Sequence, residues 1–159
     1  MKNEINNCIV IAEAGVNHNG KLSFAKKLAL VAKKSGADFV KFQIYQRTEQ
    51  ISKYANTASY QRKGSKEKKM LEMSKNYDLS WDDHILLKKY CNKIKIKYLA
   101  SCFDKKSLNF YVNKLKGKII KIGSGEITNF PLLKEIYKKK IQIILSTGMS
   151  NMHEINKAL

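Results

Sequence analysis

Apolar runs alternate with segments of helical period along this chain, a pattern typical of βα units around a parallel sheet. Five apolar runs predict strands, at residues 8–14, 37–43, 96–101, 118–123 and 141–147. Helices are expected at residues 23–35, 80–94, 105–115 and 131–139, with a last segment capped by Ser150. Because a complete (β/α)₈ barrel needs eight strands and about 250 residues, five units predict either an open sheet or an incomplete barrel.

Two segments carry more specific signals. The helix at 23–35 has Ser23 as its expected N-cap and Gly36 as its stop, with an apolar stripe formed by Phe24, Leu28, Val31 and Ala32. Residues 44–77 are polar and show no sustained period. A loop of this length inside a compact domain is typical of a functional or mobile segment.

The chain has 159 residues and a formal net charge of +18, which fits one domain with a real core. Nearly all of the cations are lysines, whereas phosphate and base recognition favours arginine. We therefore expect no nucleic-acid partner and interpret the charge as compositional bias, compatible with an anionic small substrate. No apolar run is long enough for a membrane span, and the N-terminus lacks the features of a signal peptide, so we expect a cytoplasmic protein.

The cysteines and histidines indicate no metal site. Cys8, Cys91 and Cys102 form no CxxC pair, and reduced thiols are expected. His18 lies in a glycine-flanked loop and is a candidate ligand or proton donor, but a single histidine does not make a metal site. Surface positions are expected for His84 and His153. The aromatic residues predicted to serve packing are Trp81, Phe103, Phe110 and Tyr111.

Polar residues follow each predicted strand, at the edge where parallel α/β folds place their sites. Lys41 and Lys121 stand inside apolar strands, where loss of water penalises an ammonium group. Each is either neutralised by a carboxylate, Glu13 or Glu126, or holds a phosphate or carboxylate ligand. The hydroxyls expected nearby, which favour a multiply charged anion, are those of Ser101, Ser124 and Ser146. Glu13 and Glu126 are alternatively an acid and a base for proton transfer.

Four motifs then occur in a recognisable order: IAEAGVNHNG, GADFVKFQ, KIGSGEITNFPLL and ILSTGMS. This order resembles the N-terminal part of the sialic acid synthase family, which includes N-acetylneuraminate, legionaminate and pseudaminate synthases. The resemblance covers about residues 8–159. The segments EAGVNHNG and GEITN are nearer the legionaminate-type branch.

The resemblance implies a fold, a reaction and partners. The family has a TIM barrel followed by an antifreeze-like domain, and condenses phosphoenolpyruvate with an N-acetylated aldose such as N-acetylmannosamine. A nonulosonic acid and phosphate are the products, and a divalent metal, Mn²⁺ or Mg²⁺, polarises the aldehyde. A homodimer is expected for the complete enzyme. By this resemblance, residues 1–159 are the N-terminal part of such a barrel.

Site roles follow from the resemblance position by position. Lys41 and Lys121 correspond to the cations that hold phosphoenolpyruvate, and the hydrogen-bond donors to it are Ser101, Ser124 and Ser146. Glu126 corresponds to the carboxylate beside the reacting enol carbons, Glu13 to the one that orients metal-bound water and sugar, and Gln43 to a position near the sugar. Asn17 and His18 match the family's first loop, in a supporting role. Tyr60 and Gln61 fall in the family's long loop after strand two, which borders the sugar.

Two departures from the family pattern matter. The family commonly has STPFD after its third strand, whereas this chain has ASCFD at residues 100–104. Cys102 in place of proline is expected to loosen the turn and weaken phosphate contact. The chain also stops before the family's two metal-binding histidines and its antifreeze-like domain, so no metal ligand is assigned. We therefore expect residues 1–159 alone to be inactive, and a non-catalytic anion-binding fragment is the alternative.

Overall fold

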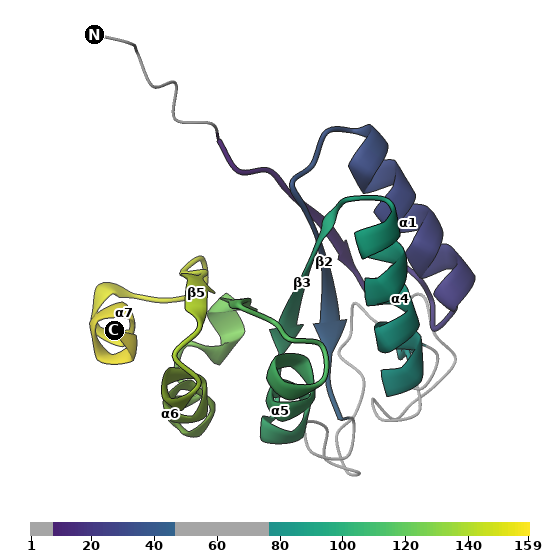
Figure 1. The fold of residues 1–159 in the computed structure, drawn as a ribbon. Coiled ribbons are helices and arrows are strands. Elements are labelled where there is room, and N and C mark those ends of the chain that lie inside the picture. The colour runs from purple at the N-terminus through teal and green to yellow at the C-terminus, as the bar shows by residue number, and fades with distance from the viewer. Residues whose placement is uncertain (1–7, 47–76) are drawn as a thin grey trace, which may run out of the picture.

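The computed structural model describes residues 8–46 and 77–159 (Figure 1). Its strands are β1 (Ile11–Gly15), β2 (Phe39–Ile44), β3 (Lys97–Cys102), β4 (Ile119–Ile122) and β5 (Gln142–Leu145). Its helices are α1 (Leu22–Lys34), α4 (Trp81–Lys93), α5 (Lys105–Asn113), the 3₁₀ turn η3 (Ser124–Glu126), α6 (Phe130–Lys138) and α7 (Met152–Ala158). The five predicted strands are confirmed. No helix in these two ranges is long and apolar enough to cross a bilayer.

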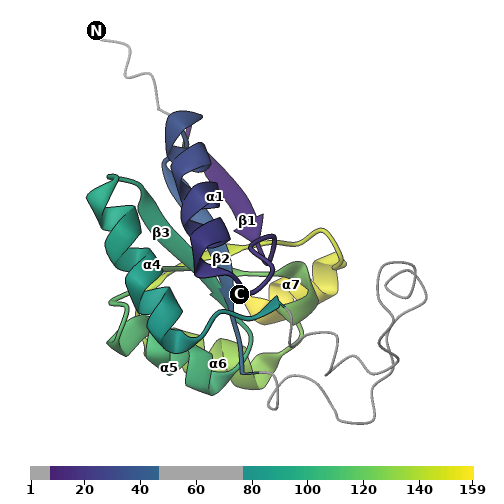
Figure 2. The same cartoon turned by 90° about the vertical axis from the view of Figure 1, so that its right-hand side faces the viewer.

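The strands form one parallel sheet in the order β1-β2-β3-β4-β5, so each strand pairs with its neighbours in sequence. Two parallel neighbours must be joined by a crossover connection, and a helix lies in each connection between successive strands from β1 to β5. The helix α7 follows β5. Figures 1 and 2 show α1 and α4 side by side against β2 and β3. This topology places the carboxyl ends of all five strands at one edge of the sheet.

One face of the sheet packs against the helices and forms the core. Val40, Phe42 and Ala100 are fully buried there, and alternate residues of each strand contribute in the same way. The helices supply mainly Ala25, Ala29, Leu87, Leu108 and Ile136. The opposite face therefore carries the intervening residues of each strand.

The start of α1 differs from the prediction. The N-cap is Lys21 rather than Ser23, and its side chain makes no capping hydrogen bond. The buried stripe consists of Ala25, Ala29 and Ala32, whereas Phe24 and Val31 are exposed. Small side chains face the sheet because they allow the helix backbone to approach it closely. The stop at Gly36 is confirmed, with a φ of 82° in the left-handed region.

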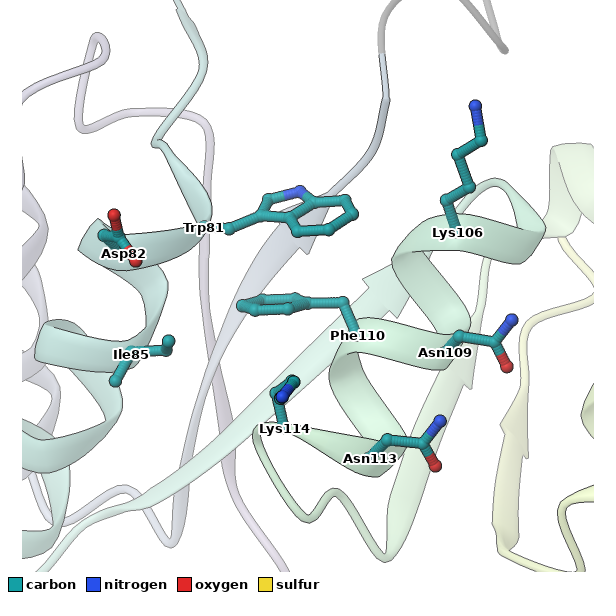
Figure 3. A pocket seen from close by; sticks show the side chains of 8 residues that line it. All are labelled: Trp81, Asp82, Ile85, Lys106, Asn109, Phe110, Asn113 and Lys114. Carbon is teal, nitrogen blue, oxygen red and sulfur yellow. The ribbon is translucent and has the colours of Figure 1, made fainter.

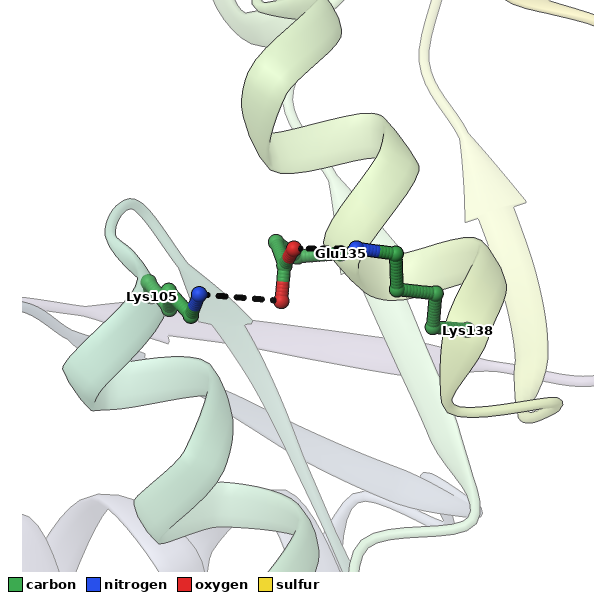
Figure 4. Close-up of polar contacts among 3 residues, drawn as sticks. All are labelled: Lys105, Glu135 and Lys138. Carbon is green, nitrogen blue, oxygen red and sulfur yellow. Dashed lines mark hydrogen bonds and ion pairs between the residues drawn. The ribbon is translucent and has the colours of Figure 1, made fainter.

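Later helices begin with side-chain caps. Ser80 accepts a hydrogen bond from the backbone N–H of Asp83, whose carboxylate accepts one in return, so α4 starts with a full capping box. The last helix is capped by Asn151, one residue after the predicted Ser150. Between α5 and α6, Glu135 forms ion pairs with Lys105 at 3.5 Å and Lys138 at 2.8 Å (Figure 4). These two cations lower the pKa of the Glu135 carboxyl, the hydrogen bond from Lys138 contributing most.

His84 is buried, and its predicted surface position is wrong. Its Nδ1 lies 2.9 Å from the hydroxyl of Tyr98 on β3, and burial lowers the pKa of the imidazole to about 4. His153 is exposed, as expected. Of the aromatic residues, Phe110 and Tyr111 are buried, while Trp81 stacks on Phe110 at 4.8 Å but stays partly exposed.

Trp81 and Phe110 form the centre of a groove of about 610 Å³ between α4 and α5 (Figure 3). Its other lining residues are Asp82, Ile85, Lys106, Asn109, Asn113 and Lys114. All of these residues belong to α4, to α5 or, for Lys114, to the residue that follows α5, so the groove is part of the helical layer.

Candidate functional site

The strand register places five of the predicted site residues on one face of the sheet. Glu13 pairs with Lys41, Lys41 with Leu99, and Gln43 with Ser101. Ala100 pairs with Ile120, so Lys121 lies on the same face as Leu99 and Ser101. This face turns away from the helix-packed core, and in a closed barrel it faces the interior.

Lys41 is the centre of this cluster. Its side chain is only 4% exposed, and its ammonium lies 2.9 Å from Oε1 of Glu13, whose side chain is 56% exposed. The ammonium also donates to the hydroxyl of the buried Ser101 at 3.4 Å. The sequence left the partner of Lys41 open between two carboxylates, and the structure shows that it is Glu13.

Burial lowers the pKa of Lys41, the neighbouring Glu13 opposes that effect, and the charge of Lys121 adds to it. Two ammonium groups therefore lie close enough on the inner face to repel each other, with one carboxylate between solvent and the buried lysine. Lys121 makes no ion pair in the part of the chain that the structure describes. An arrangement with one uncompensated cation beside a neutralised one attracts an anion.

The remaining predicted donors lie at the carboxyl ends of β4 and β5. Ser124 begins the 3₁₀ turn that directly follows β4. Ser146 follows β5, and its backbone N–H donates to the carbonyl of Ile122 at 3.0 Å. Both residues are half-buried. The structure therefore brings these two hydroxyl-bearing residues to the same edge as Lys121, although no hydrogen bond within the described residues joins their side chains to Lys41 or Lys121.

Glu126 is held by a residue that the sequence reasoning did not single out. Asn129 Nδ2 donates to Oε2 of Glu126 at 2.8 Å, while Asn129 Oδ1 caps α6 by accepting from the N–H of Leu132. Glu126 forms no ion pair among the described residues, so it is not the counterion of Lys41 or Lys121. An asparagine directly before Phe-Pro is a helix-start signal, and that pattern would have pointed to Asn129.

The loop after β1 places its polar residues differently. Asn17 is exposed, whereas His18 is buried against Phe42, with ring centres 6.1 Å apart. Phe42 belongs to the helix-packed face, so His18 lies on the opposite side of the sheet from Lys41. Its Nδ1 accepts a hydrogen bond from the N–H of Gly20, and burial lowers the pKa of the imidazole. His18 therefore supports the loop rather than joining the cationic cluster.

The turn after β3 is firmly held despite the departure at Cys102. That thiol is buried and lies 3.6 Å from the carbonyl of Ser107. Asp104 accepts hydrogen bonds from the N–H groups of Ser107 and Gln46, both at 2.7 Å, and so links the end of β2 to the start of α5. Asp104 thus anchors this turn from both sides, and the expected loosening relative to proline stays a prediction.

The described residues contain no group of three or more His, Cys, Asp or Glu side chains able to hold a metal ion. The site residues found here thus do not by themselves make a donor set for a divalent cation. Tyr60 and Gln61 lie outside the described residues.

A parallel βα sheet with a cationic cluster on its inner face is typical of a barrel-type α/β fold. Truncated 3-deoxy-D-arabino-heptulosonate 7-phosphate synthase from Thermotoga maritima shares this fold, with a TM-score of 0.61 at 15% identity over 96% of this chain and 45% of that one. The fold is thus of the TIM-barrel type, and the chain contains part of the barrel. More specifically, the chain belongs to the NeuB family, whose profile matches residues 28–159.

Similarity to several named synthases supports membership of this family. The chain is 47% identical to N,N'-diacetyllegionaminic acid synthase of Campylobacter jejuni, over 95% of this chain and 45% of the relative. It is 43% identical to the enzyme of that name from Legionella pneumophila, over 96% of this chain and 43% of the relative. The N-acetylneuraminic acid synthetase of Leptospira borgpetersenii, solved with citrate, has a TM-score of 0.80 at 29% identity, covering 96% of this chain and 49% of that one. The chain thus spans less than half the length of these relatives.

Proposed function

We propose that this chain forms part of a nonulosonic acid synthase that condenses phosphoenolpyruvate with an N-acetylated aldose, such as N-acetylmannosamine or a related sugar. The observation that carries the proposal is the buried Lys41, ion-paired to Glu13 and beside Lys121 on the inner face of a partial barrel. Two cations at this place suit a substrate that has both a phosphate and a carboxylate. The citrate in the Leptospira synthetase structure is consistent with a pocket that takes small anions.

In the proposed reaction, carbon 3 of the enol forms a bond to the aldehyde carbon of the sugar. Water adds to carbon 2, and the bond between carbon 2 and the phosphate oxygen breaks, which releases inorganic phosphate. Lys41 and Lys121 bind the anionic groups, and the residues that donate hydrogen bonds to them are Ser101, Ser124 and Ser146. Lys41 is held ready for this task because Glu13 keeps its ammonium charged in a buried place.

The two carboxylates have separate tasks in this proposal. Glu126, held by Asn129 at 2.8 Å, guides the water or a proton at the enol carbons. The Glu13 side chain is more than half exposed, so Oε2 orients the sugar while Oε1 holds Lys41. Gln43, paired in register with Ser101, lies near the sugar.

A divalent metal, Mn²⁺ or Mg²⁺, belongs to the proposal as the group that polarises the aldehyde. The described residues do not fit a complete metal site, so its ligands would come from elsewhere in the protein. The binding and proton-transfer tasks of the proposal belong to this chain's own residues. A homodimer and a cytoplasmic location stay predictions.

The test is turnover by the full-length protein with phosphoenolpyruvate, manganese and N-acetylmannosamine, followed as phosphate release. Lys121→Gln removes one cation and leaves the buried ion pair of Lys41 and Glu13 in place. We expect kcat/KM for phosphoenolpyruvate to fall roughly 10- to 100-fold, as for loss of a charge-assisted hydrogen bond. Lys134→Gln, an exposed lysine on α6, is the matched control and should leave kcat/KM unchanged. Equal activity of Lys121→Gln and the unaltered enzyme would refute the anion-site assignment.

Within the family, a legionaminate-type or pseudaminate-type activity is the second candidate. The two relatives at 43% and 47% identity carry the name N,N'-diacetyllegionaminic acid synthase, which indicates a product with two N-acetyl groups. Assays that compare N-acetylmannosamine with a diacetamido aldose distinguish the candidates by kcat/KM.

Residues 1–159 expressed alone are expected to be inactive. A non-catalytic anion-binding fragment would bind phosphoenolpyruvate without turnover, and titration calorimetry separates that outcome from complete loss of the site. Turnover by residues 1–159 alone would contradict the expectation.

A further inference from the structure

Lysines are concentrated at the amino-terminal edge of the sheet, opposite the edge with the proposed active site. Three successive junctions, each counted from the last residue of a helix to the first residue of the next strand, carry three lysines each, and eight of these nine lysines are exposed. The nine lysines are Lys93, Lys95, Lys97, Lys114, Lys116, Lys118, Lys138, Lys139 and Lys140. Cations in the last turn of a helix are explained by the helix dipole, but Lys97 and Lys118 belong to or directly precede strands. The pattern thus exceeds what helix capping requires.

Carboxylates are scarce at this edge. Within the described residues, Asp38 is the one acidic residue in a connection that leads from a helix to a strand, and its Oδ2 accepts a hydrogen bond from the N–H of Val10 at 2.8 Å. Lys97, Lys116 and Lys118 form no ion pair in the described part of the chain. A general excess of lysine would not by itself remove carboxylates from one edge.

Part of this edge is concave. A groove of about 310 Å³ opens beside the starts of β2, β3 and β4, and its lining among the described residues includes four lysines and no acidic residue. Its lining residues are Phe39, Lys88, Asn92, Lys97, Tyr98, Tyr111, Lys116, Gly117, Lys118 and Ile119. A volume of this size is at the lower end of small-molecule sites.

The walls of the groove are held in place by contacts within the chain. Tyr111 donates its hydroxyl hydrogen to the carbonyl of Ile119 at 2.8 Å. Its ring lies so near Gly117 that a Cβ there would stand 2.3 Å from a ring carbon. Lys88 donates to the carbonyl of Leu115, and the Lys97 ammonium lies 5.1 Å from the ring centre of Phe39. The lysines are therefore presented from a fixed backbone rather than from a free loop.

We propose that this groove is a second anion site, which binds a small oligophosphate, an anion with at least two linked phosphate groups. An ammonium binds phosphate oxygens as a point charge, and the charges of the exposed Lys97, Lys116 and Lys118 together exceed what a single phosphate neutralises. The concave shape favours a compact ligand over an extended nucleic-acid backbone. The site is distinct from the Lys41 cluster, because Lys41 and Lys121 line no part of it.

The test measures binding of inorganic triphosphate to the full-length protein by titration calorimetry at physiological ionic strength. The triple variant Lys97→Gln, Lys116→Gln, Lys118→Gln should bind about tenfold more weakly, equivalent to about 1.4 kcal/mol. The control variant Lys33→Gln, Lys34→Gln, Lys134→Gln loses the same charge from exposed positions outside the groove and should bind within about twofold of the unaltered protein.

Lysine acetylation with mass spectrometry then locates the ligand in the unaltered protein, so the test does not depend on the folding of any variant. Triphosphate should protect Lys97, Lys116 and Lys118 while Lys33 and Lys34 stay reactive. The proposal is overturned if only Lys41 and Lys121 are protected, if both triple variants weaken binding equally, or if an oligonucleotide binds and triphosphate does not.

Discussion

Replacing Glu13 by glutamine tests the buried ion pair directly. The substitution keeps an oxygen that accepts a hydrogen bond from Lys41 but removes the negative charge 2.9 Å from its ammonium. Loss of one partner of a fully buried pair costs about 3–5 kcal/mol. Because the Glu13 side chain is 56% exposed, water replaces part of the lost charge, and about 1–2 kcal/mol of destabilisation is expected.

Lys41→Met completes the comparison. Methionine fills similar space without a charge, so this variant should be as stable as the unaltered protein or more so. Adding Glu13→Gln to Lys41→Met should then change the free energy of unfolding by less than about 0.5 kcal/mol, because no buried ammonium remains to lose its partner. Urea denaturation followed by circular dichroism measures all four proteins. Equal unfolding free energies for Glu13→Gln and the unaltered protein would refute the reasoning.

The pH dependence of the unfolding free energy tests the same ion pair independently. Burial lowers the pKa of Lys41 in the folded state below its ordinary value of 10.5. Between the folded and the unfolded pKa the unfolded chain binds more protons, so stability rises with pH in that window. Glu13→Gln removes the group that opposes the lowering, and the rise should begin at a lower pH than in the unaltered protein. Lys41→Met should abolish this contribution.

Two further perturbations test other parts of the fold. Gly117→Ala places a Cβ against the ring of Tyr111 and should destabilise the protein by about 2 kcal/mol or more in thermal unfolding. Gly123→Ala has open space around its Cβ and should stay within about 0.5 kcal/mol. The pKa of His84 is about 4 in the folded protein, against 6.5 in the unfolded chain. Between pH 6.5 and 4 only the unfolded chain binds a proton at this residue, so about 3 kcal/mol of stability should be lost as the pH falls through this range. His84→Gln, which can still bond Tyr98, should flatten that loss in denaturation curves; an unchanged slope would contradict the assignment.

Signals contained in short segments predicted the structure well. The five apolar runs became five strands because a parallel sheet covered by helices needs continuous apolar segments. The helix expected at residues 80–94 is confirmed as α4, and its capping box uses only residues three apart in the sequence. The burial of Lys41 could likewise be predicted from its place within FVKFQ.

Features that depend on tertiary neighbours were not predictable in the same way. His84 follows three polar or aromatic residues at a helix start and looks exposed, yet its partner Tyr98 comes from a distant strand. The choice of Glu13 over Glu126 for Lys41 follows from strand register, which pairs Glu13 with Lys41 directly. No periodicity within one segment contains that register.

The order β1-β2-β3-β4-β5 has a consequence for how the chain acquires its structure during synthesis. Every new strand pairs with the one made just before it, so no strand must wait for a distant partner to leave the ribosome. Short sequence separation between partners favours fast folding, and the nascent sheet can grow one βα unit at a time. Lys41 acquires its carboxylate as soon as the second strand forms, before the cation of the fourth strand has been translated.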